Sequence, residues 1–219
     1  MNVFLLKLIA LTTMIIDHYG AIFHSDIYLF RMIGRLAFPI YCFLLVEGYF
    51  HTKDIKKYAT RLFIFALMSE IAFDYAFYGK LELGHQNIFF TLLIGLCAMY
   101  FLDNKEGKYS FSNKTVLIIA GILALFISVD YSFIGIIYIL AFYFTKDYPN
   151  PKRLYRVGLT LILTNLLFAS MLQQFSLLAL PIIYFYNGNL GPKNKILQWS
   201  FYIAYPLHLF VFYMIKTSI

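Results

Sequence analysis

An aspartate and a histidine stand side by side within an apolar stretch, at Asp17 and His18. Histidine titrates near neutral pH and can act as a general base, and a nearby carboxylate can orient such a base. A second histidine, His208, lies in another apolar stretch near the far end of the chain. We interpret His18 as the candidate base, Asp17 as a group that sets its local field, and His208 as a second acid/base group. The competing interpretation is a buried histidine that only packs.

Two pairs of charged residues follow helical spacing. Arg31 and Arg35 are four residues apart, as are Glu70 and Asp74, so each pair shares one helix face. We expect the two arginines to meet the two carboxylates across a helix–helix contact. Two roles stay open: an ion-pair set that joins the helices, or an arginine that also binds an anionic substrate group or a developing oxyanion.

The composition indicates the kind of element that carries these residues. Of 219 residues, 61% are apolar and 13% charged, with a mean hydropathy of +0.72. Soluble domains carry about 25% charged residues, so a soluble globule is excluded and a membrane protein is indicated. Two cysteines inside apolar runs give no disulfide framework. We predict one domain over residues 1–219, an all-α polytopic transmembrane helical bundle of about nine helices, with a range of eight to ten. The predicted helices cover residues 3–22, 28–50, 58–79, 86–102, 115–129, 131–145, 155–171, 175–187 and 196–216.

The distribution of Lys and Arg predicts the orientation of this bundle. Cytoplasmic loops of membrane proteins carry an excess of these residues. With a cytoplasmic N-terminus, 14 of the 18 lysines and arginines fall inside, and the outside receives Arg31, Arg35, Lys80 and Lys216. A single long helix over 115–145 would remove this bias, so we predict a hairpin that turns at Asp130-Tyr131. The net charge of +7 is thus explained by topology, and no nucleic-acid partner is expected.

Several polar residues are predicted to lie at one depth. A helical rise of about 1.5 Å per residue puts them about 14 to 24 Å from the cytoplasmic helix ends. This group is His18, Arg35, Glu70, Asp74 and His208. Three further polar residues, Asn87, Asp130 and Tyr131, fall at the predicted outer helix ends. Ionisable groups in a bilayer usually face a bundle interior or a water cavity, so we predict a chamber that opens outward or is reached from both faces. Pro39 and Pro206 should kink their helices beside it.

The familiar motifs of hydrolytic sites do not occur. We interpret His24 and His85 as interfacial loop residues and His51 as the cap of an inside loop. These three histidines have no metal-ligand spacing, and neither HExxH nor GxSxG is present. We therefore expect no metal.

The ordered set of short motifs resembles the TraX family over essentially the whole chain. The segments that carry the resemblance include Asp17-His18-Tyr19-Gly20, Gly34-Arg35-Leu36-Ala37-Phe38-Pro39, Gln86-Asn87-Ile88-Phe89, Asp130-Tyr131-Ser132 and Tyr205-Pro206-Leu207-His208. That family is named for the conjugative-pilus protein that acetylates pilin. The resemblance implies a membrane acyltransferase of the bacterial cytoplasmic membrane that uses cytoplasmic acetyl-CoA. The implied acceptor is an amine or hydroxyl of a peptide, pilin-like protein or envelope glycan near the outer face.

We assign roles to the polar residues on this hypothesis. Arg35 or Asn87 would stabilise the oxyanion, while Glu70 and Asp74 would hold the arginines and recognise a cationic amine. Substrate-binding candidates are Arg31, Asp130 and Tyr131. Lysine and arginine bind phosphate, so the candidates for the CoA phosphates are Lys57, Arg61, Arg153 and Arg156.

Two other classes of function stay open. Polar groups at mid-depth on several helices also describe a proton-coupled secondary transporter or exporter, although the sequence shows no inverted repeat. A structural assembly factor would leave the polar layer unexplained.

Overall fold

The computed structural model of the chain describes residues 1–104, 111–192 and 194–218. Lys105, Lys108 and Lys193, which belong to the predicted inside charges, lie outside the described residues. The predicted all-α class is confirmed for the described part, where one isolated bridge, Gln86 to Val129, is the sole β-type pairing. The elements in chain order are α1 (Val3–Phe23), α2 (Tyr28–Gly34), α3 (Ala37–His51), α4 (Ile55–Tyr78), α5 (Ile88–Asp103), α6 (Asn113–Phe126), α7 (Ser132–Phe144), α8 (Lys152–Phe168), the 3-10 helix η1 (Met171–Leu178), α9 (Ala179–Tyr184) and α10 (Lys195–Ser218).

Two segments among the described residues are both long and apolar enough to cross a membrane, Val3–Phe23 and Tyr28–His51. The second segment spans α2 and α3. Helices α4 and α10 each have 24 residues, which corresponds to about 36 Å, but they carry more polar and charged side chains.

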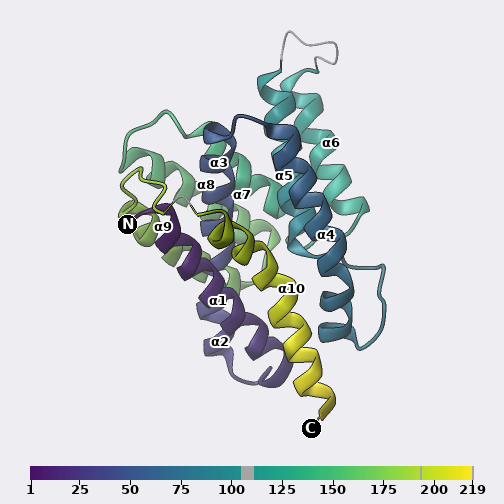
Figure 1. Cartoon of the computed structure of the whole chain (residues 1–219). Helices are drawn as coiled ribbons and strands as arrows, with labels where there is room; N and C mark the ends of the chain where they lie inside the picture. Colours follow the sequence, from purple (N-terminus) through teal and green to yellow (C-terminus); the bar gives the residue numbers. More distant parts are fainter. Residues whose placement is uncertain (105–110, 193, 219) are drawn as a thin grey trace.

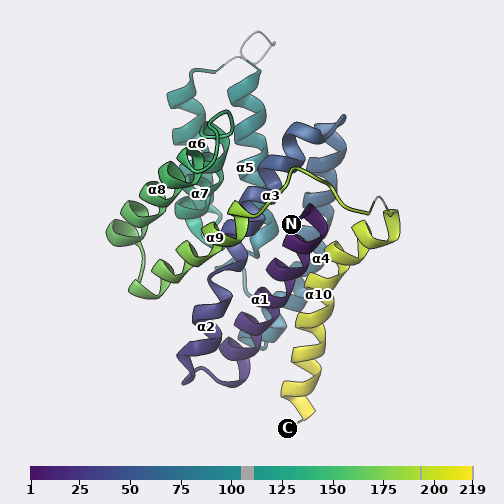
Figure 2. The same cartoon turned by 90° about the vertical axis from the view of Figure 1, so that its left-hand side faces the viewer.

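The helices form two groups around α3 (Figure 1, Figure 2). Helix α1 packs against α2, α3 and α10, and α10 also packs along α4. Helices α5, α6, α7 and α8 pack in sequence order through α5–α6, α6–α7 and α7–α8 contacts. Figure 2 shows α8 and α9 on the side of the molecule away from α4 and α10. The C-terminal end of α5 and the N-terminal end of α6 lie at one end of the molecule, and the C-terminus of the chain lies at the other.

The predicted helix 28–50 is interrupted at Arg35-Leu36. Pro39 explains the break, because it has no N–H to donate to the Arg35 carbonyl and its ring crowds that carbonyl. The kink predicted at Pro39 is therefore confirmed. Helix α10, in contrast, continues through Pro206, so the kink predicted at this proline involves no interruption of the helix.

The α6–α7 connection confirms the predicted hairpin at Asp130-Tyr131. Helix α6 ends at Phe126 and α7 begins at Ser132. Three non-glycine residues here have positive φ: Ser128 at 55°, Tyr131 at 61° and Ser132 at 48°. Such conformations cost about 1–3 kcal/mol each and cluster at functional sites, so this turn is held by its surroundings.

The predicted helix 175–187 is wrong in its extent. The chain forms η1 from Met171 to Leu178 and then the short α9. Pro181 lies in the first turn of α9, the position where a helix tolerates a missing N–H. A single α-helix over both segments would need a Pro181 N–H for the Leu177 carbonyl, so the helix type changes before the proline.

Candidate functional site

Two adjoining cavities lie between the helix groups. The first, here called the histidine chamber, has a volume of about 180 Å³ and is lined by Asp17, His18 and residues of α2, α3, α4, α10 and the α6–α7 turn. The second, here called the basic cavity, has a volume of about 420 Å³. They have four lining residues in common, Met14, Tyr41, Ile88 and Tyr205. A wall only one layer of side chains thick therefore separates them.

His18 and His208 form a direct hydrogen bond, although 190 positions separate them. His208 Nδ1 lies 2.8 Å from the Ala204 carbonyl oxygen, which can only accept, so Nδ1 carries the hydrogen of the neutral ring. The unprotonated Nε2 of His208 then accepts from His18 Nδ1 at 2.7 Å. This assignment leaves the lone pair of His18 on Nε2. The Ala204 carbonyl and His208 thus prepare His18 to take a proton.

Asp17 binds the two arginines of the 31/35 pair and not the neighbouring His18. Its carboxylate lies 2.9 Å from Arg31 Nη1 and 2.8 Å from Arg35 Nη2. The predicted contact of the arginines with Glu70 and Asp74 is wrong. The reason lies in the α1–α2 packing, since a Cβ on Gly34 would overlap the Asp17 carboxylate. The glycine lets α2 approach α1 closely enough for Asp17 to reach both guanidinium groups.

The two carboxylates of α4 serve the α4–α5 connection instead. Glu70 accepts from both the backbone N–H of Asn87, at 3.2 Å, and the side-chain amide of Asn87. Asp74 accepts from the Glu82 N–H at 3.0 Å. Neither carboxylate lines the histidine chamber. Their hydrogen bonds instead fix the connection that leads into α5.

The two predicted oxyanion donors already donate hydrogen bonds to protein groups. Arg35 donates through Nη2 to Asp17, through Nη1 to Gln173 at 3.3 Å and through Nε to the Arg31 carbonyl at 3.3 Å. The Asn87 amide donates to the Ala66 carbonyl at 2.8 Å and to Glu70. These contacts make both residues supports of the chamber wall.

His85 and Asp130 form the rim of the chamber. His85 Nε2 lies 3.8 Å from the Asp130 carboxylate, and both residues line the cavity. The nearby Asp130 carboxylate favours the charged imidazolium and raises the pKa of His85 above 6.5. Tyr131, also in the lining, stacks on Phe38 with ring centroids 3.9 Å apart. Sequence reasoning treated His85 as a loop residue, although its position beside the Gln86-Asn87 motif was a usable signal.

The basic cavity contains one of the four predicted phosphate-binding residues, Arg61. Lys57 is instead exposed and pairs with Asp54 at 3.3 Å, while Arg153 pairs with Glu47 at 3.4 Å. The guanidinium of Arg156 lies 3.9 Å from the centre of a tyrosine ring outside the cavity.

Two lysines that the prediction left out, Lys7 and Lys53, line this cavity together with Arg61. Both had been explained by topology alone. The three cations come from α1, the α3–α4 connection and α4. Their charges make the cavity suitable for an anionic group.

Comparisons with known proteins point to one family. The family model described as TraX protein matches residues 3–216. The "Probable fimbrial assembly protein FimC, serogroup H1" of Dichelobacter nodosus is 31% identical over an alignment of 236 positions, which covers 95% of this chain and 93% of that protein. An uncharacterized protein of Rickettsia prowazekii is 28% identical over 152 residues, covering 68% of this chain and 58% of that protein. No solved structure matches.

Proposed function

This chain belongs to the TraX family, and we propose that it is a multi-pass membrane acyltransferase. It moves an acetyl group from cytoplasmic acetyl-CoA to an amine or hydroxyl of an acceptor near the outer face. The observation that carries the proposal is the pair of cavities with a common wall, one basic and one containing a prepared histidine base.

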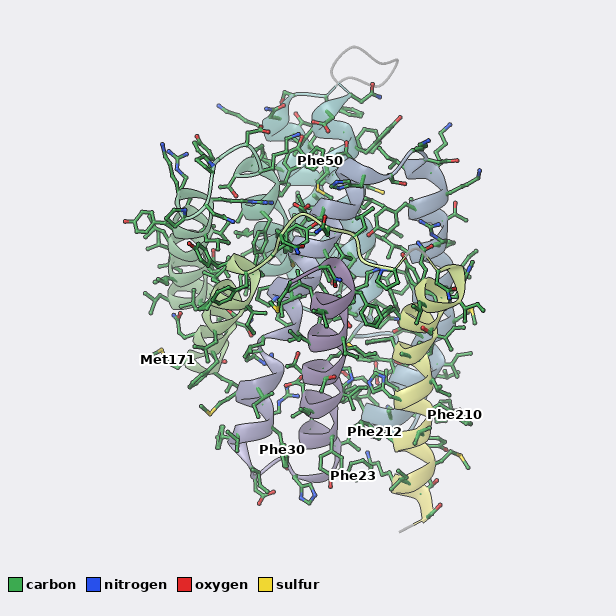
Figure 3. All side chains as sticks on the ribbon, turned by 60° about the vertical axis from the view of Figure 1, so that its left-hand side comes forward. Phe23, Phe30, Phe50, Met171, Phe210 and Phe212 are labelled. Carbon is green, nitrogen blue, oxygen red and sulfur yellow. The ribbon has the colours of Figure 1, made fainter. Side chains whose placement is uncertain are left out.

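Exposed apolar side chains support a position within the bilayer. A soluble protein rarely leaves large contiguous apolar areas uncovered, whereas this chain exposes them on several helices. Phe126 of α6 is 86% exposed, Leu167 of α8 70% and Phe210 of α10 53%. Figure 3 shows Met171 and Phe210 at the outer edges on two different sides of the molecule. With the excess of Lys and Arg in the predicted inside loops, these surfaces favour a multi-pass protein of the bacterial cytoplasmic membrane with a cytoplasmic N-terminus.

The chemistry starts at His18. Its free Nε2 takes the proton of the acceptor N–H or O–H, and the acceptor atom attacks the carbonyl carbon of the thioester. The electrons of the C=O bond move to oxygen and then return as the C–S bond breaks. The CoA thiolate leaves with the proton that His18 collected. His208 would stabilise the transient positive charge of His18 through the hydrogen bond that joins them.

The donor would approach through the basic cavity. Lys7, Lys53 and Arg61 provide the charge that phosphate groups require, and the thioester end would pass the common wall toward His18. The acceptor would approach from the histidine chamber, where the Asp130 carboxylate would accept a hydrogen bond from the neutral acceptor amine. Arg31 also lines this chamber, at its more exposed side.

The name of the Dichelobacter nodosus relative, a probable fimbrial assembly protein, supports one choice of acceptor. A fimbrial or pilin-like peptide is therefore our first choice of acceptor, with an envelope glycan as the second.

The test uses purified protein, labelled acetyl-CoA and cell-envelope fractions. The wild-type chain should transfer label to an envelope component, and His18→Ala should abolish this transfer. His24→Ala is the matched control, since His24 lies in the loop after α1 and outside both cavities. Full activity of His18→Ala would disprove the assigned role of the base.

A proton-coupled transporter is the second candidate, and the interrupted α2–α3 segment beside two separated cavities favours it. Proton-linked uptake of a solute into liposomes without acetyl-CoA would support this function. Transfer of label in detergent, where no gradient exists, would support the enzyme.

A further inference from the structure

Tyr205 belongs to the wall between the two cavities and is only 3% exposed. Its ring meets the rings of His18 and His208 edge-on, with centroids 5.9 Å and 5.6 Å apart. Phe89 packs against it from α5 at 5.2 Å. The tyrosine is therefore fixed beside the histidine pair, at the point where the two proposed substrates would meet.

The hydroxyl of Tyr205 is buried, and its O–H donates to no acceptor among the described residues. Leaving a buried polar group unpaired costs about 1–3 kcal/mol. Other buried tyrosines avoid this cost: Tyr138 donates to Asn165 at 2.5 Å and Tyr49 donates to Asp103 at 2.7 Å. The Tyr205 O–H is consequently a donor that has no acceptor among the described residues.

The reaction needs such a donor. Acyl transfer places negative charge on the carbonyl oxygen of the thioester, and a positioned hydrogen-bond donor stabilises it. Asn87 uses both amide hydrogens within the protein, and Arg35 is held in place by hydrogen bonds from each of its three side-chain nitrogens to protein groups. Arg31 lies on the more exposed side of the chamber, with 29% of its side chain accessible. Tyr205 lies at the junction itself.

We propose that Tyr205 is a catalytic residue whose hydroxyl donates a hydrogen bond to the carbonyl oxygen of the acyl thioester. This inference rests on the proposed acyl transfer. When the acceptor atom bonds to the carbonyl carbon, the electrons of the C=O bond move to oxygen, and the Tyr205 O–H holds the oxyanion. When the C=O bond re-forms, the C–S bond breaks, and the thiolate leaves with the proton held by His18. The tyrosine keeps its own proton throughout.

The experiment compares Tyr205→Phe, which removes only the hydroxyl, with Tyr213→Phe as control. Tyr213 lies on the same helix outside both cavities. The full-length proteins are assayed for acetyl transfer and for binding of S-ethyl-CoA, a thioether that has no carbonyl oxygen. We expect Tyr205→Phe to lower kcat about 10²–10³-fold, with KM and the Kd of S-ethyl-CoA unchanged within about twofold. Tyr213→Phe should match the wild type.

Three results would overturn the inference. Wild-type activity in Tyr205→Phe would remove the hydroxyl from the reaction while leaving the proposed function intact. A parallel loss of S-ethyl-CoA binding would show that the hydroxyl supports the structure and not the oxyanion. Absence of transfer by the wild-type chain would overturn the proposed function and this inference together.

Discussion

The ion-pair cluster between α1 and α2 predicts a large loss of stability for Asp17→Asn. The Asp17 side chain is 12% exposed and lies within 2.9 Å of both Arg31 and Arg35. The substitution leaves two guanidinium groups without a counter-charge, and breaking a buried ion pair from one side costs about 3–5 kcal/mol. Solvent moderates the share of Arg31, whose side chain is 29% exposed. We therefore expect the free energy of unfolding to fall by about 3 kcal/mol.

The assay is reversible unfolding in mixed micelles, followed by the loss of helical circular dichroism. Asp26→Asn is the matched control, because Asp26 is exposed in the α1–α2 connection and should change the free energy by less than about 0.5 kcal/mol. The double variant Asp17→Asn/Arg35→Gln should lose less than the sum of its single variants, since it removes the unpaired charge as well. A loss below about 1 kcal/mol for Asp17→Asn, or strict additivity in the double variant, would refute the reasoning.

Three further predictions follow from particular contacts. Gly34→Ala should destabilise the fold by about 1–3 kcal/mol through overpacking, whereas Gly121→Ala should not, because nothing lies within 4 Å of its new Cβ. Unfolding in mixed micelles measures both variants, and equal effects would contradict the close α1–α2 packing. Arg61→Ala should raise KM for acetyl-CoA several-fold with kcat retained, while Lys57→Ala should match the wild type, and the reverse order would contradict the basic cavity as donor site. Because the pKa of His85 is raised, the ion pair of His85 with Asp130 stabilises the fold fully below the unfolded-state pKa of 6.5, and this contribution is lost as the pH rises through the higher folded-state pKa. His85→Gln should therefore be less stable than the wild type by about 0.2–1 kcal/mol at pH 5.5 and equally stable at pH 8.5. A difference in stability that does not change with pH would contradict the assignment.

The sequence predicted well those features that depend on local chemistry. Pro39 removes a specific backbone hydrogen bond, so the break before it could be placed within a few residues. The charge balance located the α6–α7 hairpin, because a wrong helix count would have reversed the excess of inside cations. The first argument depends on one residue and the second on a count along the chain, and neither needs the contacts between distant residues.

Side-chain partners were predicted less well because a depth estimate gives height along a helix but not direction. Glu70 and Arg35 share a depth range, yet Glu70 binds Asn87 and Arg35 binds Asp17. The hydrogen bond of His18 to His208 depends on the packing of α1 against α10, which no local pattern encodes. Pairing across the bundle needed the three-dimensional arrangement.

The basic residues show a second limit of sequence reasoning. The same lysines and arginines satisfy the positive-inside rule wherever they lie within a loop, so charge alone could not separate Arg61, which lines a cavity, from Lys57, which faces solvent. Lys7 was overlooked because it stands alone in α1. Its cavity position arises from the packing of α1 against α10.

The central claim is that donor and acceptor reach His18 from opposite faces of the membrane, and the sidedness of transfer tests it most directly. The purified chain is reconstituted into sealed vesicles, and molecules of one orientation are selected by tag cleavage. Labelled acetyl-CoA is supplied on the face that bears Lys53 and Arg61, and a synthetic peptide with a free N-terminal amine is enclosed on the other face. We predict label on the enclosed peptide, and none with His18→Ala. Labelling only when both substrates share one face would contradict the account.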